Sequence, residues 1–240
     1  MSTYIINRVP RIHSRDSNTG SGSRESSGYG WTSWNSPPWK HAEELEVSFF
    51  HPGSKSTHPN TRCKVLYDKS FLYWSFRVED RWVRARFLEY QDPVCRDSCV
   101  EFFVQPAQEA GYFNFELNCI GTMQLFYIED PTRTKTGFMK ATPISATDAA
   151  GIQIRASIQE RPYLPENHEP MEWWMDAAVP FSLFSKHVPE FTPPVPGTEW
   201  RGNFYKCADD SSHPHWAAWA PIGDELNFHV PQYFGTLRFA

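Results

Sequence analysis

The chain has 240 residues, with 23 lysines and arginines against 28 aspartates and glutamates, so its formal net charge is -5. This length is enough for one domain with a sizeable core, and all-β domains often reach it. The negative balance argues against nucleic acid or an anionic membrane as the main partner. No stretch approaches the roughly 18 consecutive apolar residues that a membrane span needs.

Aromatic residues make up 16% of the chain and include 10 tryptophans. They allow two interpretations: bulky core side chains, or flat platforms on which sugar rings or bases stack. The 5 cysteines form no C-x-x-C pair and are odd in number, so they predict neither a zinc site nor a disulfide framework. We expect Cys119, on the apolar phase of its strand, to be a buried free thiol.

The N-terminal region predicts one short strand followed by a flexible segment. Residues 14–30 are rich in serine and glycine, a composition typical of a flexible loop or linker. The residues before them suffice for one edge strand of the same domain, so we expect a single domain over residues 1–240. No signal peptide is visible in the first twenty residues, which leaves the localisation open.

The rest of the chain alternates short apolar-polar runs with turns rich in proline and glycine. No helical apolar stripe of useful length appears, although 181–186 suggests one turn after Pro180. Many short strands between turns predict an all-β fold, an antiparallel β-sandwich. The predicted strands cover residues 45–50, 63–68, 71–80, 122–128, 151–158, 173–181, 200–207 and 233–239.

The most informative segment is residues 97–121, which predicts a β-hairpin with one apolar and one polar face. If Gln105 pairs with Tyr112, the same register places Glu101 directly opposite Glu116. Like charges facing each other destabilise a sheet. Two carboxylates gathered with amides on the polar outer face therefore indicate a site.

The pair of glutamates allows three interpretations. Glu101 and Glu116 are acceptors for sugar hydroxyls, or the general acid and nucleophile of a glycoside hydrolase, or part of a solvated face. In the last case a basic residue neutralises them, and Arg201 is the candidate on its strand. Catalytic carboxylates need environments that separate their pKa values, and neighbouring strand positions offer no obvious asymmetry.

Two acidic groups are candidates for metal ions. Asp209, Asp210, His213 and His215 carry suitable ligand atoms, but Pro214 separates the histidines, so a polar loop between two strands is the simpler interpretation. Glu79 and Asp80 with nearby carbonyls are a candidate for structural calcium, which requires six to eight oxygen ligands. Nucleophile elbows, phosphate loops and H-E-x-x-H motifs are missing from the sequence.

Several segments together resemble family 9-like carbohydrate-binding modules. They occur in the order WKHAEELEV, VLYDKSFLYWSFRVED, DSCVEFF, YFNFELNCIGT, VPFSLF, WRGNFYKC, WAPI and FHVPQYFGTLRF, and they span nearly all of the chain after about residue 35. The resemblance implies a β-sandwich of immunoglobulin-like or jelly-roll type. It also implies non-catalytic binding of xylan- or cellulose-type oligosaccharides in polysaccharide catabolism. Some members of that family carry structural calcium, and similar modules are often secreted.

The resemblance transfers a sugar site only in part. Glu101 matches the family's glutamate that accepts hydrogen bonds from sugar hydroxyls. Cys95 and Phe228 stand where the best-known members have the two tryptophans that enclose a sugar ring, and Glu116 replaces a basic residue. Phe228 and His229 match a variant of the family's closing segment, written F-H-x-P-x-x-F-G.

Three functions therefore remain open. The first is a carbohydrate-binding sandwich whose site residues are Glu101, Glu116, Asn118, Arg201, Phe228 and His229. The second is a glycoside hydrolase that uses the two glutamates. The third is a protein-interaction sandwich without a sugar site. In the first case, Trp82 or Trp216 could replace a lost aromatic platform from an exposed loop.

Overall fold

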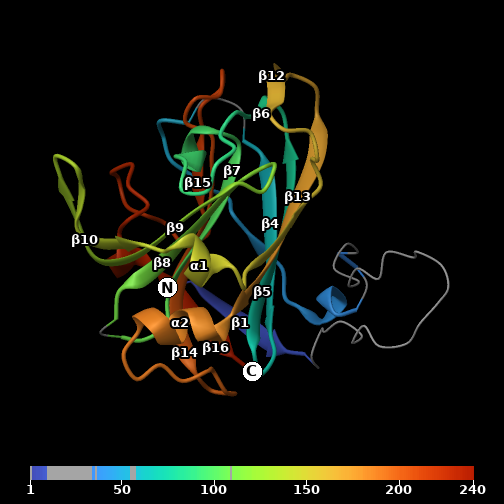
Figure 1. The fold of residues 1–240 in the computed structure, drawn as a ribbon. Coiled ribbons are helices and arrows are strands. Elements are labelled where there is room, and N and C mark those ends of the chain that lie inside the picture. Colours follow the sequence, from blue (N-terminus) through green and yellow to red (C-terminus); the bar gives the residue numbers. More distant parts are fainter. Residues whose placement is uncertain (1, 10–33, 36, 55–57, 109) are drawn as a thin grey trace, which may run out of the picture.

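The computed structural model describes residues 2–9, 34–35, 37–54, 58–108 and 110–240 (Figure 1). The predicted flexible segment at 14–30 lies outside the described residues. The described residues form a β-sandwich, which confirms the predicted all-β fold. Their helices are all too short and too polar to cross a membrane.

Two sheets meet at a shared N-terminal strand. The first sheet has the order β10 (Gly137–Pro143), β9 (Met123–Thr134), β8 (Tyr112–Asn118), β7 (Cys99–Gln105), β14 (Glu199–Cys207), β16 (Gly235–Phe239) and β1 (Thr3–Arg8). The second continues from β1 to β4 (Asn60–Tyr67), β5 (Phe71–Asp80), β13 (Met171–Pro180) and β11 (Gln153–Ala156). The first four residues of β1 pair in parallel with β16 and its last two pair in parallel with β4. The strand expected at an edge therefore joins the sheets.

Short elements complete the sandwich. They are β2 (Leu45–Glu46), β3 (Phe49–Phe50), β6 (Val83–Ala85), β12 (Tyr163–Asn167), β15 (Trp216–Ala218), α1 (Ala146–Ala149), α2 (Phe181–His187) and the 3₁₀ turns η1 (Trp39–His41), η2 (Val94–Arg96) and η3 (Pro231–Tyr233). The strand predicted over 45–50 is split, because β2 pairs with β4 whereas β3 pairs with β15. The turn predicted after Pro180 is the helix α2, for which Pro180 is the N-cap residue.

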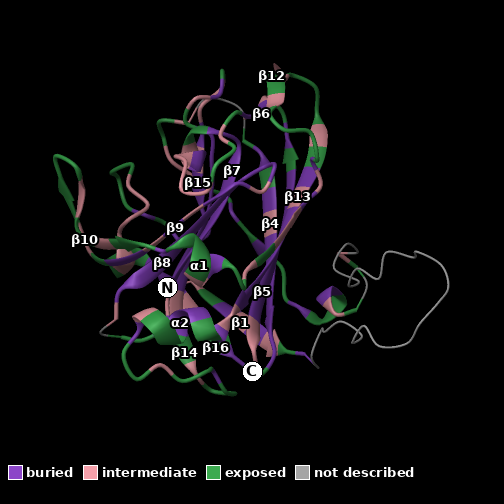
Figure 2. Cartoon of the chain, in the orientation of Figure 1, coloured by how far each residue is buried: buried purple, intermediate pink, exposed green. Residues whose placement is uncertain are grey.

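The core lies between the inner faces of the two sheets (Figure 2). Trp74 of β5 contacts Phe102 of β7 and Phe115 of β8, with ring centroids 5.2 and 5.1 Å apart. Phe102 also stacks on Phe204 of β14 at 4.4 Å. Each such side chain contributes about 1.5–3 kcal/mol on burial, so these contacts fix the two sheets against each other.

The outer face of the first sheet is covered, contrary to the prediction of a half-buried hairpin. All seven residues of β8 are buried. A second apolar cluster explains this, because Phe103, Tyr112 and Tyr205 on the outer face pack against Ile222 and Phe234 from the C-terminal region. The polar residues of the hairpin therefore lie beneath this cover, and a cavity opens above some of them.

Candidate functional site

The cavity lies on the outer face of the first sheet and has a volume of about 690 Å³. Its floor consists of side chains from four adjacent strands: Cys207, Glu101, Asn114, Glu116, Gln124 and Phe126. Its walls come from the β9–β10 hairpin, the segment 226–229, and residues Cys95, Asp209 and Trp216. This volume is in the range of sites that bind small molecules.

The paired glutamates form the centre of the floor, as the hairpin register predicted. Glu101 of β7 faces Glu116 of β8, and both are buried. Glu101 Oε1 accepts a hydrogen bond from the Cys207 thiol over 3.1 Å. Glu116 Oε1 accepts one from Asn114 Nδ2 over 2.8 Å. The two carboxyl groups are thus positioned by separate neighbours.

Burial raises the pKa of both glutamates. For Glu101, removal from water raises the pKa well above its usual range, and the negative charge of Glu116 adds to this effect. For Glu116, burial raises the pKa to about 7, and the Asn114 hydrogen bond opposes the rise. Both carboxyl groups therefore hold protons more readily than exposed glutamates, and each can donate or accept a hydrogen bond near neutral pH.

The residue expected to neutralise the glutamates does not do so. Arg201 lies near the start of β14, opposite Gln105, and donates to the carbonyl oxygens of Gln232 and Phe234 at 3.2 and 2.8 Å. Arg133 of β9 lines the cavity, and its positive charge lowers the pKa of Glu116. The hairpin wall therefore supplies the cation that acts on Glu116, whereas the charge of Lys206 on β14 lowers the pKa of Glu101.

Aromatic rings supply the apolar part of the cavity. Phe228 stacks on Tyr205 with centroids 4.1 Å apart and an interplanar angle of 11°. Trp216, at the start of β15, lines the cavity and donates from Nε1 to Asp209 Oδ1 over 2.7 Å. This hydrogen bond fixes the orientation of the indole. Of the two tryptophans considered as replacement platforms, Trp216 lies in the cavity on a strand, whereas Trp82 stacks on His213 outside it.

Cys95 and His229, taken from the family resemblance, line the cavity beside Phe228, whereas Asn118, taken from the polar phase of its strand, does not. His229 Nδ1 is hydrogen-bonded to the Tyr112 hydroxyl at 2.9 Å. Burial lowers the pKa of His229 to about 3, so its ring is neutral. Asn118 is outside the lining, because its amide donates to Phe87 O and Asp97 Oδ2 and its oxygen accepts from the Thr122 backbone.

The acidic groups considered for metal ions are separated or already paired. Asp210 pairs with Arg86 and Arg96, whereas buried His215 contacts Lys206 Nζ at 2.7 Å. The residues between β14 and β15 thus form the expected loop and no joint ligand set.

Within the described residues, Glu79 and Asp80, the candidates for calcium, are each paired with a basic side chain. The Asp80 carboxylate contacts the buried Lys206 ammonium at 3.3 Å and accepts from the Arg81 backbone. Glu79 is exposed and pairs with Arg62 at 3.2 Å. An ammonium group therefore occupies the position where a calcium ion would approach Asp80, and the two acidic residues do not converge.

Sequence reasoning missed several lining residues, namely Gln124, Phe126, Arg133, Phe138 and Cys207, and it considered Asp209 only as a metal ligand. The first two were predictable in principle, because Gln124 pairs with Glu116 and Phe126 with Asn114 across β8 and β9. Phe138 and Arg133 depend on the β9–β10 hairpin, where the Arg133 guanidinium lies 4.1 Å from the Phe138 ring centroid. No local pattern marked that hairpin as a wall.

A family profile described as carbohydrate-binding family 9 matches residues 43–239. The chain belongs to this family. No curated protein matches it significantly.

The structure resembles the crystal structure of a protein from Bacteroides uniformis ATCC 8492 described as carbohydrate-binding, with a TM-score of 0.79 and 23% identity over 99% of both chains. It also resembles a family 9 module from Caldicellulosiruptor kristjanssonii in two complexes. With glucose, the TM-score is 0.59 and the identity 14% over 100% of this chain and 96% of that one. With cellotriose, the values are 0.58 and 14% over 99% and 93%. These similarities confirm the fold.

Proposed function

We propose that the chain binds oligosaccharides of the cellulose or xylan type in the cavity and does not cleave them. The observation that carries the proposal is the composition of the cavity, with a polar floor built around two carboxyl groups and aromatic rings on its walls. Sugars present hydroxyl groups at the ring edge and C–H groups on the ring face, so they need both kinds of surface. Family membership and the glucose and cellotriose complexes of the Caldicellulosiruptor module support the same class of ligand.

Each part of the cavity has a role in this proposal. Glu101 and Glu116 exchange hydrogen bonds with sugar hydroxyls, and Asn114 and Gln124 extend the polar floor. Trp216 provides the stacking platform, because Asp209 already holds its indole in place. Phe228 presents one face to Tyr205, so it contributes an apolar wall held in a fixed position. Binding then requires little reorganisation, which favours affinity.

Asn118 and Arg201 have no part in this proposal. The Asn118 amide is committed to the loop that carries Phe87 and Asp97. The Arg201 guanidinium holds the backbone of residues 232–234. Both residues therefore support the cover over the sheet.

Non-catalytic binding explains the two carboxyl groups better than glycoside hydrolysis does. A retaining hydrolase needs one carboxylate held ionised as the nucleophile and the other protonated as the acid. Here burial raises the pKa of both Glu101 and Glu116, so the site does not set their protonation in opposite directions. Prolonged incubation with xylo- and cello-oligosaccharides should yield no product.

The proposal is tested by isothermal titration calorimetry with glucose and with cello-, xylo- and manno-oligosaccharides. We expect saturable binding of a cello- or xylo-oligosaccharide, and a loss of about 5- to 100-fold in affinity for Trp216→Ala, since aromatic stacking is worth roughly 1–3 kcal/mol. Trp174→Ala is the matched control, because Trp174 is a half-buried strand tryptophan outside the cavity. A folded protein that binds none of these sugars would overturn the proposal, as would equal losses in both variants.

A further inference from the structure

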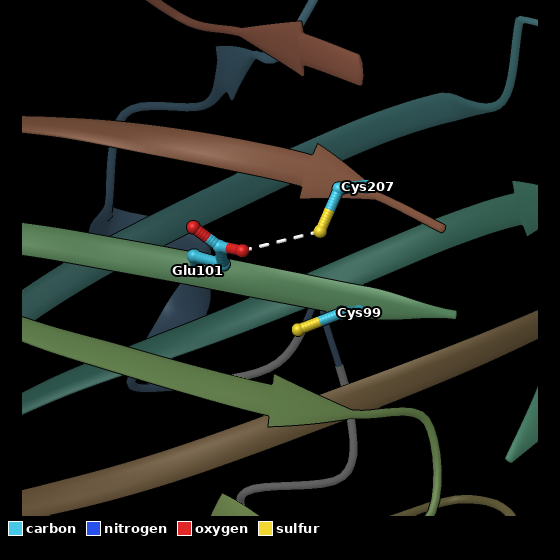
Figure 3. Close-up of side chains that lie close together, drawn as sticks. All are labelled: Cys99, Glu101 and Cys207. Carbon is cyan, nitrogen blue, oxygen red and sulfur yellow. Dashed lines mark hydrogen bonds between the residues drawn. The ribbon is translucent and has the colours of Figure 1, made fainter. Parts of the chain in front are cut away.

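Two cysteines and a glutamate converge at one end of the cavity floor (Figure 3). Cys99 and Glu101 are alternate residues of β7, so their side chains leave the same face of the strand. Cys207 is the register partner of Cys99 on β14. All three side chains are buried, and their ligand atoms lie within 4.8 Å of one another.

The distances suit a tetrahedral zinc ion. Zinc bonds of about 2.3 Å to sulfur and about 2.0–2.2 Å to oxygen place neighbouring ligand atoms about 3.5–3.8 Å apart. Cys207 Sγ and Glu101 Oε1 are 3.1 Å apart, so a small outward movement would admit the ion between them. Two thiolates and a carboxylate also carry the negative charge and the soft sulfur donors that zinc prefers.

The cation whose charge acts on Glu101 and Cys99 is Lys206, and it is engaged elsewhere. Lys206, which follows next to Cys207 along the backbone, directs its ammonium to Asp80 and His215. Among the described residues, no lysine or arginine forms an ion pair with Glu101. In place of a cation, Glu101 has the Cys207 thiol, which donates a hydrogen bond to its carboxyl group.

We propose that Cys99, Glu101 and Cys207 form a binding site for a thiophilic divalent cation such as Zn²⁺, with the fourth coordination position open to the cavity. The open position follows from the lining, because Glu101 and Cys207 both border the cavity. On binding, Zn²⁺ takes the place of the two thiol protons and of the proton that the buried Glu101 carboxyl group holds, and these protons pass to the solvent. The sulfur lone pairs then form the two Zn–S bonds, and a Glu101 oxygen forms the Zn–O bond. Water or a sugar hydroxyl then completes the tetrahedron.

A disulfide between Cys99 and Cys207 is the competing outcome. It would consume the thiol that donates to Glu101 and leave that buried carboxyl group without this donor, which costs free energy. The metal site uses all three groups at once. It does not rest on sugar binding, so a protein that binds Zn²⁺ and no sugar would leave this inference standing.

The test uses the full chain, reduced, freed of metal with a chelator and then titrated with Zn²⁺ by calorimetry. We expect one ion per chain, release of about two to three protons (two from the thiols and one from Glu101 where it is protonated), and a thiolate-to-metal charge-transfer band when Co²⁺ replaces Zn²⁺. Cys207→Ser should weaken binding by at least about 100-fold, since even outer-shell changes cost about 10–100-fold. Cys63→Ser is the matched control, because Cys63 is a buried free cysteine on β4 of the other sheet.

Circular dichroism shows whether each variant is folded. If Cys207→Ser does not fold, Glu101→Gln replaces it as the test variant, because it keeps both thiols. Glu101→Gln should weaken Zn²⁺ binding and retain the cobalt-thiolate band. No saturable heat and no cobalt band in the wild-type chain would overturn the inference. Equal losses for Cys207→Ser and Cys63→Ser, or a Cys99–Cys207 disulfide that forms in place of the metal complex, would do the same.

Discussion

Each sheet buries charged side chains on its outer face, but the two sheets treat them in opposite ways. On the second sheet, Arg77 donates to Asp176 Oδ1 at 3.0 Å, and the Ser75 hydroxyl donates to the same oxygen at 2.6 Å. The rings of Trp34 and Trp174 each lie 5.2 Å from the Arg77 guanidinium. We call Ser75, Arg77 and Asp176 the ion-pair cluster.

On the outer face of the first sheet, two carboxyl groups are buried side by side, and burial raises the pKa of both. Glu101 and Glu116 face each other across β7 and β8, and a cavity lies above them in place of aromatic covers. Buried charge that is paired serves the fold, whereas buried like charge costs free energy that the fold does not recover. The comparison therefore teaches that Asp176 has its counter-charge within the chain, although Asp176 Oδ2 and Arg77 Nη2 are buried without a hydrogen-bond partner in the described residues. No lysine or arginine in that part of the chain forms an ion pair with either glutamate, so we expect a group from outside the chain to complete the glutamate pair.

The largest expected effect comes from breaking the ion-pair cluster. Arg77→Met should lower the free energy of unfolding by about 3–5 kcal/mol, because it leaves the carboxylate of Asp176 buried and unpaired. Urea unfolding followed by circular dichroism measures the loss. Sugar affinity should remain unchanged, because Arg77 lies on the other sheet, away from the cavity lining.

An exposed ion pair is the control for this effect. Arg238 and Glu199 form a contact of 2.6 Å at the surface, where such pairs contribute under about 1 kcal/mol. Arg238→Met should therefore change the free energy of unfolding by less than that amount. If both arginine variants lose the same stability, the ion-pair cluster has no special role. The double change Arg77→Met with Asp176→Leu should recover most of the loss.

The next effect concerns His229, the neutral imidazole on the cavity wall. It faces Tyr112 of β8, and the positive charge of Arg133 on β9 helps burial to keep its pKa low, at about 3. In the unfolded chain the pKa is about 6.5, so below that pH the unfolded state binds a proton that the folded state does not. The stabilising effect is present above pH 6.5 and is lost as the pH falls towards 3.

Between pH 7 and pH 5 this single group should lower the free energy of unfolding by about 2 kcal/mol, from 1.36 kcal/mol per pH unit. His229→Gln removes the titration and keeps a polar partner for Tyr112. The variant should therefore lose less stability than the wild type over this interval, as measured by urea unfolding at both pH values. Equal losses would show that His229 is not held neutral.

The fold was largely predictable from the sequence, because strand patterns repeat every two residues and survive without knowledge of tertiary contacts. Residues 71–80 form β5 as predicted, and the hairpin register placed Glu101 opposite Glu116. The prediction that failed was that the polar face of the hairpin is open to solvent. Nothing in residues 97–121 shows that Phe234 and Ile222 pack over Phe103 from the far end of the chain.

The candidate site was predictable where one hairpin supplied it and where the family resemblance or an unassigned tryptophan pointed to a residue, as for Phe228, His229 and Trp216. Gln124 follows from extending the register to the next strand, whereas Arg133 enters through a hairpin whose direction no periodicity encodes. Asn118 and Arg201 were placed in the site because they share the polar phase of their strands. The alternation along a strand shows which face of the sheet a side chain is on, but not where on that face the cavity lies. The side chains of Asn118 and Arg201 form hydrogen bonds outside the cavity.

The smallest effect on stability is the most informative one for the comparison. Glu116→Gln should leave the free energy of unfolding unchanged or raise it by about 1 kcal/mol, because it removes one of two like charges and keeps an oxygen for the Asn114 amide. The same change should weaken sugar binding by about fivefold, since a hydrogen bond to a charged group exceeds a neutral one by about 1 kcal/mol.

The measurements are urea unfolding and calorimetry with a cello-oligosaccharide, both on protein freed of metal. Glu129→Gln is the control, because Glu129 lies on β9 outside the cavity lining and pairs with Lys140 at 2.6 Å. It should alter neither sugar affinity nor stability by more than a surface pair does. A large loss of stability in Glu116→Gln would mean that the glutamate pair is as much a structural element as the ion-pair cluster, and the contrast between the two sheets would fail.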